Sequence, residues 1–273
     1  MKKLKIKFHR GYLSFPYAAV SVVFVIIPLI LILVYAFTDK SGAPTWDNFE
    51  RLSDPSLWLT MGRSLIIAFL TTVICLVLAY PTAMALTKIK ASKQMILLTV
   101  FIMPMWINSL LRIYAVKLFF GDVMGMERGF LLTLIGMVYD FFPFMLLPIY
   151  TILADMDKGV LEASADLGAS PLITFLKVRL PLSVPGIVSG VLMVFMPTVS
   201  SFAVYDILGY NGGNAGFLDG KLFGNIVYTY FEKGYYNYGS ALALVLLTLI
   251  ILSTLISNVV TKGKAVKKGG TIS

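Results

Sequence analysis

Chemistry in this sequence has to come from carboxylates and aromatic rings, because the side chains that build most catalytic and metal sites are nearly absent. The chain holds one histidine, His9, and one cysteine, Cys75. A histidine-based zinc site or a serine or cysteine triad needs more of these residues. A single cysteine also excludes an intrachain disulfide. We therefore expect no metal-dependent or triad-based catalysis from this chain.

Two aspartates in or beside long apolar runs are the first candidates for a functional site. An acid in the middle of such a run, as Asp140 is, costs about 2.5 to 3.5 kcal/mol to insert into a bilayer, so a function or a partner must retain it. A desolvated cation needs a paired carboxylate, and aromatic faces attract it further. The candidate site residues at and around these acids are Trp106, Asn108, Tyr139, Asp140, Tyr205 and Asp206.

Each of the two aspartates, Asp140 and Asp206, has a second interpretation that the sequence leaves open. Asp140 would also be stable as a protonated acid or as the partner of a lysine or arginine. Asp206 would also be stable as a solvated acid at the end of a helix. Arg112, at the end of the run that contains Asn108, is expected to extend its side chain to the membrane surface.

A polar segment between two apolar runs has the pattern of two short helices joined by a turn. Small and apolar residues within 160–167 give the first helix one face, and Gly168 supplies the left-handed residue that ends it. Ser170 and Pro171 fit the cap and the first position of the second helix. Small residues allow a protein partner to approach closely while Glu162 orients it, although an amphipathic helix lying on the bilayer has the same pattern.

The composition of the chain excludes a water-soluble fold. Of its 273 residues 58% are hydrophobic and 14% are charged, and the mean hydropathy is +0.84. Six runs with few or no charges approach the roughly 20 residues that cross a bilayer as a helix. These runs are 13–37, 64–87, 94–111, 129–153, 180–205 and 239–261.

The distribution of charge orients these spans. If both termini are cytoplasmic, most of the 23 lysines and arginines lie on the inner side and most acids lie on the outer side, as the positive-inside rule requires. Contact with anionic lipid then explains the net charge of +9 without a nucleic acid. A cleavable signal peptide is the alternative for the first run, but 13–37 is longer than the roughly 7 to 15 residues of a signal core.

The polar segment 155–179 also carries a family signature. Its Glu-Ala-Ser tripeptide at 162–164, the glycine at 168 and the Val-x-Leu-Pro run at 178–181 resemble the Glu-Ala-Ala, Gly, Ile-x-Leu-Pro signature of bacterial ABC importer permeases. Ser164 and Val178 are conservative departures from it. The resemblance implies a cytoplasmic coupling helix that inserts into a cleft of a separate ATPase subunit. The residues that it assigns to this contact are Glu162, Ala163, Ser164, Asp166 and Gly168.

The chain itself has no motif for hydrolysing ATP. No Gly-x-x-x-x-Gly-Lys-Ser/Thr run occurs in it, and the pair Gly220-Lys221 is followed by Leu222. The resemblance therefore implies a transport subunit that is not an enzyme and binds no cofactor. ATP and magnesium would belong to the partner ATPase.

Four segments resemble the first permease subunits of spermidine/putrescine ABC importers. They are 104–114, 143–150, 162–168 and 202–209, and the similarity extends from residue 46 to residue 247. It implies that the six candidate residues from Trp106 to Asp206 belong to a polyamine passage, which this chain forms with a second, homologous permease. It also implies an ATPase homodimer and an extracytoplasmic polyamine-binding protein as partners, within a lipid bilayer and without nucleic acid.

We therefore expect an all-α polytopic protein of the bacterial cytoplasmic membrane, with six transmembrane helices, both termini in the cytoplasm and the type I ABC importer transmembrane fold. Residues 1–60 would form the basic N-terminal segment, the first helix and an outer loop, 61–262 the transmembrane core, and 263–273 a basic tail. Two alternatives remain open. One is an importer permease for another solute, such as thiamine or ferric ion. The other is an ion-coupled carrier with Asp140 as a relay. An inverted internal repeat would favour this carrier, and the sequence shows no convincing repeat.

Overall fold

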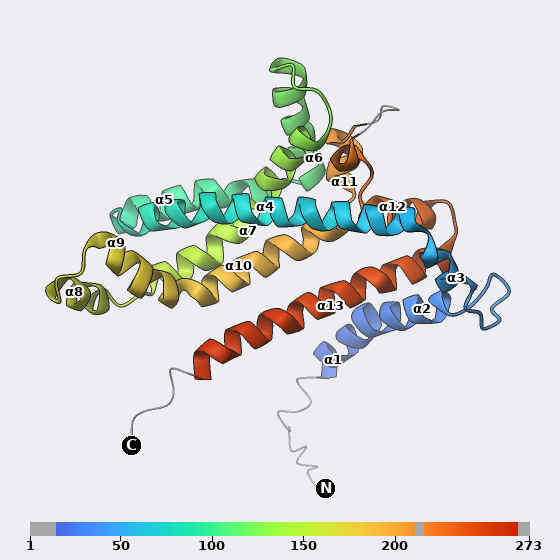
Figure 1. Ribbon diagram of the computed structural model, residues 1–273, viewed down its shortest axis with the longest axis horizontal. Helices are drawn as coiled ribbons and strands as arrows, with labels where there is room; N and C mark the ends of the chain where they lie inside the picture. The colour runs from blue at the N-terminus through green and yellow to red at the C-terminus, as the bar shows by residue number, and fades with distance from the viewer. Residues whose placement is uncertain (1–14, 211–215, 267–273) are drawn as a thin grey trace, which may run out of the picture. The chain divides into compact units, whose positions relative to one another are not determined.

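A computed structural model describes residues 15–210 and 216–266, and these residues are mostly helical (Figure 1). The basic N-terminal segment and the end of the basic tail lie outside the described residues. The chain divides into two compact units. The first unit comprises Met1–Asp54 and Val227–Thr248, and the second comprises Pro55–Ile226 and Leu249–Ser273. The domain boundaries that the sequence predicts stay a prediction.

Three long helices form the body of the second unit. α4 (Pro55–Thr87) and α7 (Phe130–Ala154) run side by side in the same direction, and α10 (Leu180–Ser200) packs against both (Figure 1). Their sequences are apolar over most of their length, so each is long enough to cross a bilayer. These helices position the predicted site residues.

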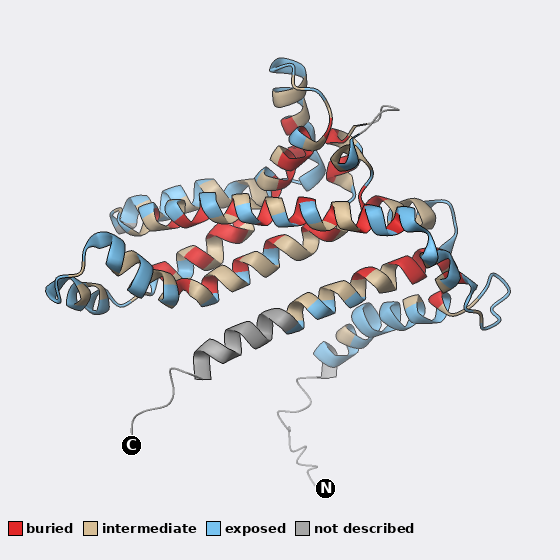
Figure 2. Cartoon of the chain, viewed as in Figure 1, coloured by how far each residue is buried: buried red, intermediate tan, exposed pale blue. Residues whose placement is uncertain are grey.

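The core of the second unit lies where the buried sides of α4, α7 and α10 face one another (Figure 2). Small side chains recur every fourth residue of α4, at Cys75, Ala79 and Ala83, and all three are fully buried. This spacing places them on one face of the helix, so that α7 packs closely against it. The Cys75 thiol accordingly lies 3.7 Å from the carbonyl oxygen of Val138 on α7.

Two glycines on α10 set its distance from α7. A Cβ atom at Gly186 would lie 2.7 Å from the carbonyl oxygen of Pro148, and one at Gly190 would lie 2.7 Å from the sulfur of Met145. Helices approach this closely only where side chains are absent. The small-xxx-small pair Gly186 and Gly190 therefore serves packing within this subunit.

We expect Gly186→Ala to destabilise the protein by about 1 to 3 kcal/mol, because the added methyl group meets a backbone oxygen that cannot rotate away. The melting temperature of the purified permease in detergent measures the effect. Gly62→Ala on α4 is the matched control, since a Cβ atom there meets nothing within 4 Å. Equal melting temperatures for the two variants would contradict the packing described above.

The expected third span, 94–111, is not one straight helix. α5 (Ala91–Ile102) continues into a 3-10 turn (Met103–Trp106), and α6 (Ser109–Val116) continues into a π-helical segment (Lys117–Val123). The two halves meet at an angle of 100°. With this bent pair counted as one span, the described residues contain six candidate spans, as the sequence predicts. The other five are Tyr17–Ala36, Pro55–Thr87, Phe130–Ala154, Pro171–Ser200 and Tyr236–Leu255.

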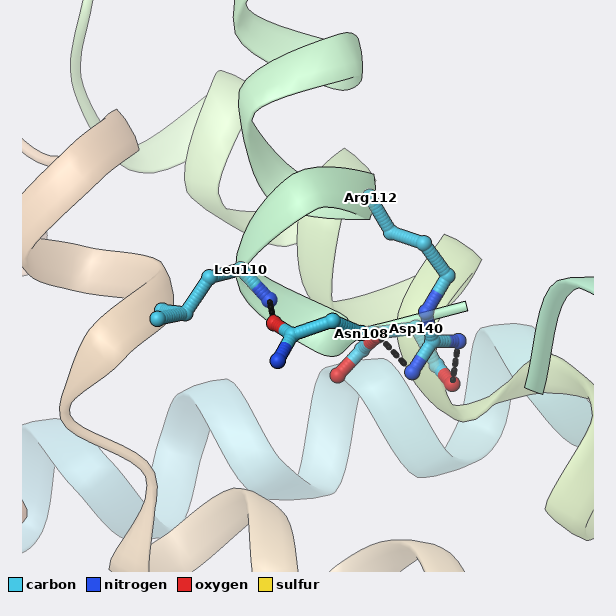
Figure 3. A network of polar contacts seen from close by, with 4 residues as sticks. All are labelled: Asn108, Leu110, Arg112 and Asp140. Atoms are coloured by element: carbon cyan, nitrogen blue, oxygen red, sulfur yellow. Dashed lines mark hydrogen bonds and ion pairs between the residues drawn. The ribbon is translucent and has the colours of Figure 1, made fainter. Parts of the chain in front are cut away.

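Local chemistry explains the break in the third span. Pro104 lacks the amide proton that a continuing helix needs. The side-chain oxygen of Asn108 accepts a hydrogen bond from the amide of Leu110 at 2.9 Å (Figure 3). Asn108 therefore caps a new helix, which starts in a new direction.

Shorter helices lie at the two ends of the second unit. One end holds α8 (Lys158–Asp166), α9 (Pro171–Thr174) and a π-helical segment (Phe175–Arg179) that leads into α10. The other end holds α11 (Ala203–Leu208), a 3-10 turn (Phe217–Asp219) and the start of α12 (Phe223–Glu232).

The first unit contains the first span. α1 (Phe15–Ser21), a π-helical segment (Val22–Ile26) and α2 (Ile27–Ala36) follow one another directly. The short α3 (Asp47–Glu50), a 3-10 turn (Arg51–Ser53) and the first part of α13 (Tyr236–Val266) complete the unit. The Asn237 amide donates to the carbonyl oxygen of Thr38 at 2.9 Å, so α13 holds the end of this span. The apolar side chains of α2 are largely exposed, which suits contact with lipid (Figure 2).

Candidate functional site

The loop after α7 folds as two short helices separated by a turn, which confirms the sequence prediction. Asp157 caps α8 by accepting a hydrogen bond from the Gly159 amide at 2.8 Å. Gly168 has a φ angle of +80°, the left-handed conformation that ends a helix and that glycine adopts without a steric penalty. Ser170 then caps α9, whose first residue is Pro171.

α8 is exposed along its length. None of its residues is buried, and Glu162, Ala163 and Asp166 are all exposed. Leu167, at the end of this helix, has 88% of its surface exposed. Covering such an aliphatic side chain with a partner is favourable by the hydrophobic effect. This helix therefore presents small residues, two exposed acids and an apolar tip.

Ser164, where the family signature has alanine, joins the two short helices. Its Oγ lies 3.0 Å from the Oγ1 of Thr174 on α9. This contact links α8 to α9, and α9 continues through the π-helical segment Phe175–Arg179 into α10. Ser164 and Thr174 therefore connect α8 to the segment that leads into a membrane span. No motif pointed to Thr174 in the sequence.

The positive-inside rule places two loops, 88–93 and 155–179, in the cytoplasm, and both lie at the same end of the second unit. Thr87 and Lys88, at the turn between α4 and α5, line a pocket together with Lys158, Glu162 and Arg179 of the loop after α7. Figure 1 shows α8, α9 and the start of α5 at this end. This agrees with the predicted topology, in which both loops are on one side of the membrane.

Asp140 is buried and forms an ion pair with Arg112 (Figure 3). The Arg112 Nη2 lies 2.7 Å from the Asp140 Oδ1, and the two side chains are only 7% and 9% exposed. The Arg112 Nη1 also donates to the carbonyl oxygen of Asp140 at 3.4 Å. The expectation that Arg112 extends to the membrane surface is wrong, because α6 packs against α7 after the bend and carries the guanidinium inward. Of the interpretations of Asp140, the paired acid is the one that the structure contains.

Two of the predicted passage residues are exposed near the bend. Trp106 has 80% of its surface exposed and Tyr139 has 42%. Tyr139 lines a groove of about 690 Å³ with Phe101, Pro104 and Phe142, which come from the bent span and α7. The groove is almost entirely apolar and aromatic, so it offers ring faces and few polar groups. Asn108 lies at the bend itself, as the cap of α6.

Tyr205 and Asp206 lie on a separate short helix, which corrects the expected fifth span 180–205. α10 ends at Ser200, because the backbone is extended at the next residue, and α11 follows. Tyr205 is buried, and its hydroxyl donates to the carbonyl oxygens of Tyr210 at 3.0 Å and Asp219 at 2.6 Å. Burial raises the pKa of the Tyr205 phenol, so it remains a donor at neutral pH. Asp206 is exposed.

Two residues that sequence reasoning missed hold Asp206. The side-chain amide of Asn225, which is 2% exposed, donates to the Asp206 Oδ1 at 2.5 Å and to the carbonyl oxygen of Phe202 at 2.9 Å. The Arg128 guanidinium donates to the main-chain oxygen of Asp206 at 3.1 Å. A signal for Asn225 was available, because Leu222, Ile226 and Tyr230 have the spacing of one helix face and Asn225 follows Leu222 by three residues.

Known proteins share both the sequence and the fold. Residues 76–265 match the family of binding-protein-dependent transport system inner membrane components. The spermidine/putrescine transport system permease protein PotB of Escherichia coli (strain K12) is 38% identical over 211 residues, which are 69% of this chain and 76% of that protein. PotB of Haemophilus influenzae is 36% identical over 68% of this chain and 73% of its own length. A PotB homolog of Mycoplasma genitalium is 27% identical over 83% of this chain and 81% of its own length.

Solved structures with low sequence identity have the same fold. A chain of a bacterial ABC transporter involved in the import of the acidic polysaccharide alginate has a TM-score of 0.71 at 16% identity, and the match covers 92% of this chain and 95% of that one. A chain of the MetNI methionine ABC transporter, in an inward facing conformation, has a TM-score of 0.60 at 19% identity and covers 78% and 99%. At these identities the similarity shows the transmembrane fold alone.

The family match covers more than half of the chain and includes the whole loop 155–179 and most of the membrane spans. The curated relatives at 36% and 38% identity are permeases of the same kind. The chain therefore belongs to the family of binding-protein-dependent transport system inner membrane components, as a multi-pass, non-catalytic permease subunit of an ABC importer with the type I transmembrane fold.

Proposed function

We propose that this permease forms, with a second homologous permease, the passage for polyamines such as spermidine and putrescine. The observation that carries the cargo is the 38% identity to PotB over 69% of the chain. The chemistry of the exposed groups supports it. Asp206 offers a carboxylate, and Trp106 and Tyr139 offer ring faces, which are the groups that a partly desolvated ammonium needs.

The six predicted passage residues divide into two roles in this proposal. Trp106, Asn108, Tyr139 and Asp206 contact the cargo. Asp140 and Tyr205 shape the passage. The Asp140 carboxylate is paired with Arg112, and the Tyr205 hydroxyl is bonded to two carbonyl oxygens.

An ATPase homodimer binds the loop 155–179 from the cytoplasm and supplies the energy. Its contact is Glu162, Ala163, Ser164, Asp166 and Gly168, and ATP and magnesium stay on the ATPase. Closure of the ATPase pair moves α8, and the contact of Ser164 with Thr174 passes this motion to α10. The passage then opens outward to an extracytoplasmic polyamine-binding protein, and hydrolysis returns it inward. Both chain termini lie in the cytoplasm.

Uptake of radiolabelled spermidine by cells that carry the complete transporter tests the function. Deletion of this permease should abolish the uptake, and the wild-type chain should restore it. Restored uptake of thiamine or ferric ion in place of spermidine would contradict the cargo. Uptake that survives ATP depletion and collapses with the proton gradient would contradict an ATP-driven importer.

Asp206→Asn should raise the spermidine concentration for half-maximal uptake about tenfold, because the cation loses about 1.4 kcal/mol of pairing. Asn225→Leu should raise it less, since the carboxylate remains but loses the amide that orients it. The maximal rate should change little in both variants. Asp122→Asn, which neutralises another exposed acid of the second unit, is the control. Unchanged uptake in Asp206→Asn would remove this acid from the passage.

A further inference from the structure

A basic pocket lies at the end of the second unit that holds α8. Its volume is about 490 Å³, and it is enclosed by the end of α4, the start of α5, the end of α7 and α8. Three cationic residues from separate segments line the pocket, namely Lys88, Lys158 and Arg179. Glu162 is the one acid of its lining. The pocket therefore combines charges that are far apart in the sequence.

The positive charge of this pocket exceeds the negative charge of its lining. Among the described residues, no carboxylate lies within 4.0 Å of the side-chain nitrogens of Lys88, Lys158 or Arg179. Three cations outnumber the single acid of the lining. Such a concentration of unpaired positive charge in a recess attracts an anion.

The position of the pocket favours the headgroup of a lipid over a soluble anion. Thr87 is the last residue of α4 and Ala154 is the last residue of α7, so two spans leave the membrane at the level of the pocket. Leu153, Met156 and Leu161 give the pocket an apolar wall beside the cations. A phospholipid presents a phosphate next to hydrocarbon, which matches this combination. Basic pockets between spans on the cytoplasmic side bind anionic headgroups.

We propose that this pocket binds the phosphate of an anionic phospholipid in the cytoplasmic leaflet. The proposal depends on the proposed function for the sidedness of the loop, and it does not depend on the cargo. Lys158 and Glu162 belong to α8, whereas Lys88 follows α4. A phosphate bound by Lys88, Lys158 and Arg179 thus joins the coupling helix to the end of α4 and the start of α10 and holds it ready for the ATPase.

Native mass spectrometry of the purified transporter tests this site by counting the lipid that stays bound. The probes are phosphatidylglycerol, phosphatidylcholine and inorganic phosphate. We expect wild type to retain phosphatidylglycerol, and Lys158→Gln to weaken its retention about fivefold, the loss for one cation near the membrane surface. The double variant Lys88→Gln, Arg179→Gln should weaken it by about 25-fold.

The matched control is Lys90→Gln with Lys93→Gln, which removes two cations beside Lys88 that do not line the pocket. It should retain phosphatidylglycerol like wild type. Equal losses in the control and in the pocket variant would overturn the site, as would equal retention of phosphatidylcholine. Equally tight inorganic phosphate would assign the pocket to a soluble anion. Pocket variants that lose the ATPase but retain phosphatidylglycerol like wild type would assign the pocket to the ATPase contact.

Spermidine uptake measured on the same preparations separates this proposal from the proposed function. If the transporter carries another solute and phosphatidylglycerol binding still depends on Lys88 and Arg179, the cargo is wrong and the lipid site stands. If spermidine is transported and the pocket variants bind phosphatidylglycerol like wild type, the lipid site is wrong and the function stands.

Discussion

Replacement of Asp140 by asparagine should destabilise this permease by about 3 to 5 kcal/mol, the largest effect we expect from a single substitution in a span. The substitution leaves the buried guanidinium of Arg112 without its counter-charge, and an unpaired charge at this position has no access to water. The pair also connects the second half of the bent span to α7, so its loss should loosen the bend. The melting temperature of the purified complex and the amount of permease in the membrane fraction measure the effect.

Removal of both charges distinguishes a direct pair from two independent residues. Arg112→Leu with Asp140→Leu should cost less than Asp140→Asn alone, because no charge remains buried. Asp122→Asn, at an exposed acid, should leave the melting temperature unchanged. A double variant whose destabilisation equals the sum of its two single variants would show that the two side chains do not act as a pair.

Glu162→Lys should reduce ATP-driven uptake about 100-fold while the permease remains folded in the membrane. The reversed charge replaces the acid that we propose orients the ATPase, and 100-fold corresponds to about 2.7 kcal/mol, within the range for truncating a charge pair at an interface. Folding should not change, because α8 has no buried residue. Copurification of the ATPase with the permease and spermidine uptake give the two readouts.

Glu232→Lys is the matched control for this variant, since it reverses an exposed acid on α12, in the predicted outer loop. It should retain both the ATPase and the uptake. Full uptake and full ATPase recovery in Glu162→Lys would remove this residue from the coupling contact. A loss of permease from the membrane in Glu162→Lys alone would show that α8 contributes to folding, against its exposure.

The coupling loop was predictable in detail because its structure follows local rules. Gly168 ends α8, Ser170 caps α9 and Pro171 begins it, and each of these positions depends on neighbours a few residues away. The amphipathic pattern of α12 was predictable for the same reason. Local chemistry therefore determines the structure of the segment that we propose as the ATPase contact.

The passage was less predictable because its contacts join residues far apart in the chain. Arg112 pairs with Asp140 only after the bend at Asn108 has redirected α6, and hydropathy contains no signal for such a bend. Asn225 holds Asp206 across a loop. A search for apolar runs locates spans, but it does not show which polar side chains meet between them.

A charge near the end of a span displaced one predicted boundary. The apolar run 64–87 predicts a span that starts after Arg63, whereas α4 begins at Pro55. Arg63 remains within the helix because its guanidinium donates to the carbonyl oxygens of Phe217 and, at 2.7 Å, of Lys221. The cost of a cation in the span is thus offset by backbone acceptors that no sequence pattern reveals.

A cysteine introduced at Ala163 tests most directly whether α8 is the segment that the ATPase binds. The native cysteine, Cys75, is fully buried, so the introduced thiol is the accessible one. In the assembled transporter, a short bifunctional reagent should cross-link this cysteine to the ATPase subunit, and a membrane-impermeant maleimide added outside the cell should not label it. Labelling from outside, or an assembled and active transporter in which this cysteine never cross-links to the ATPase, would contradict the coupling function of α8.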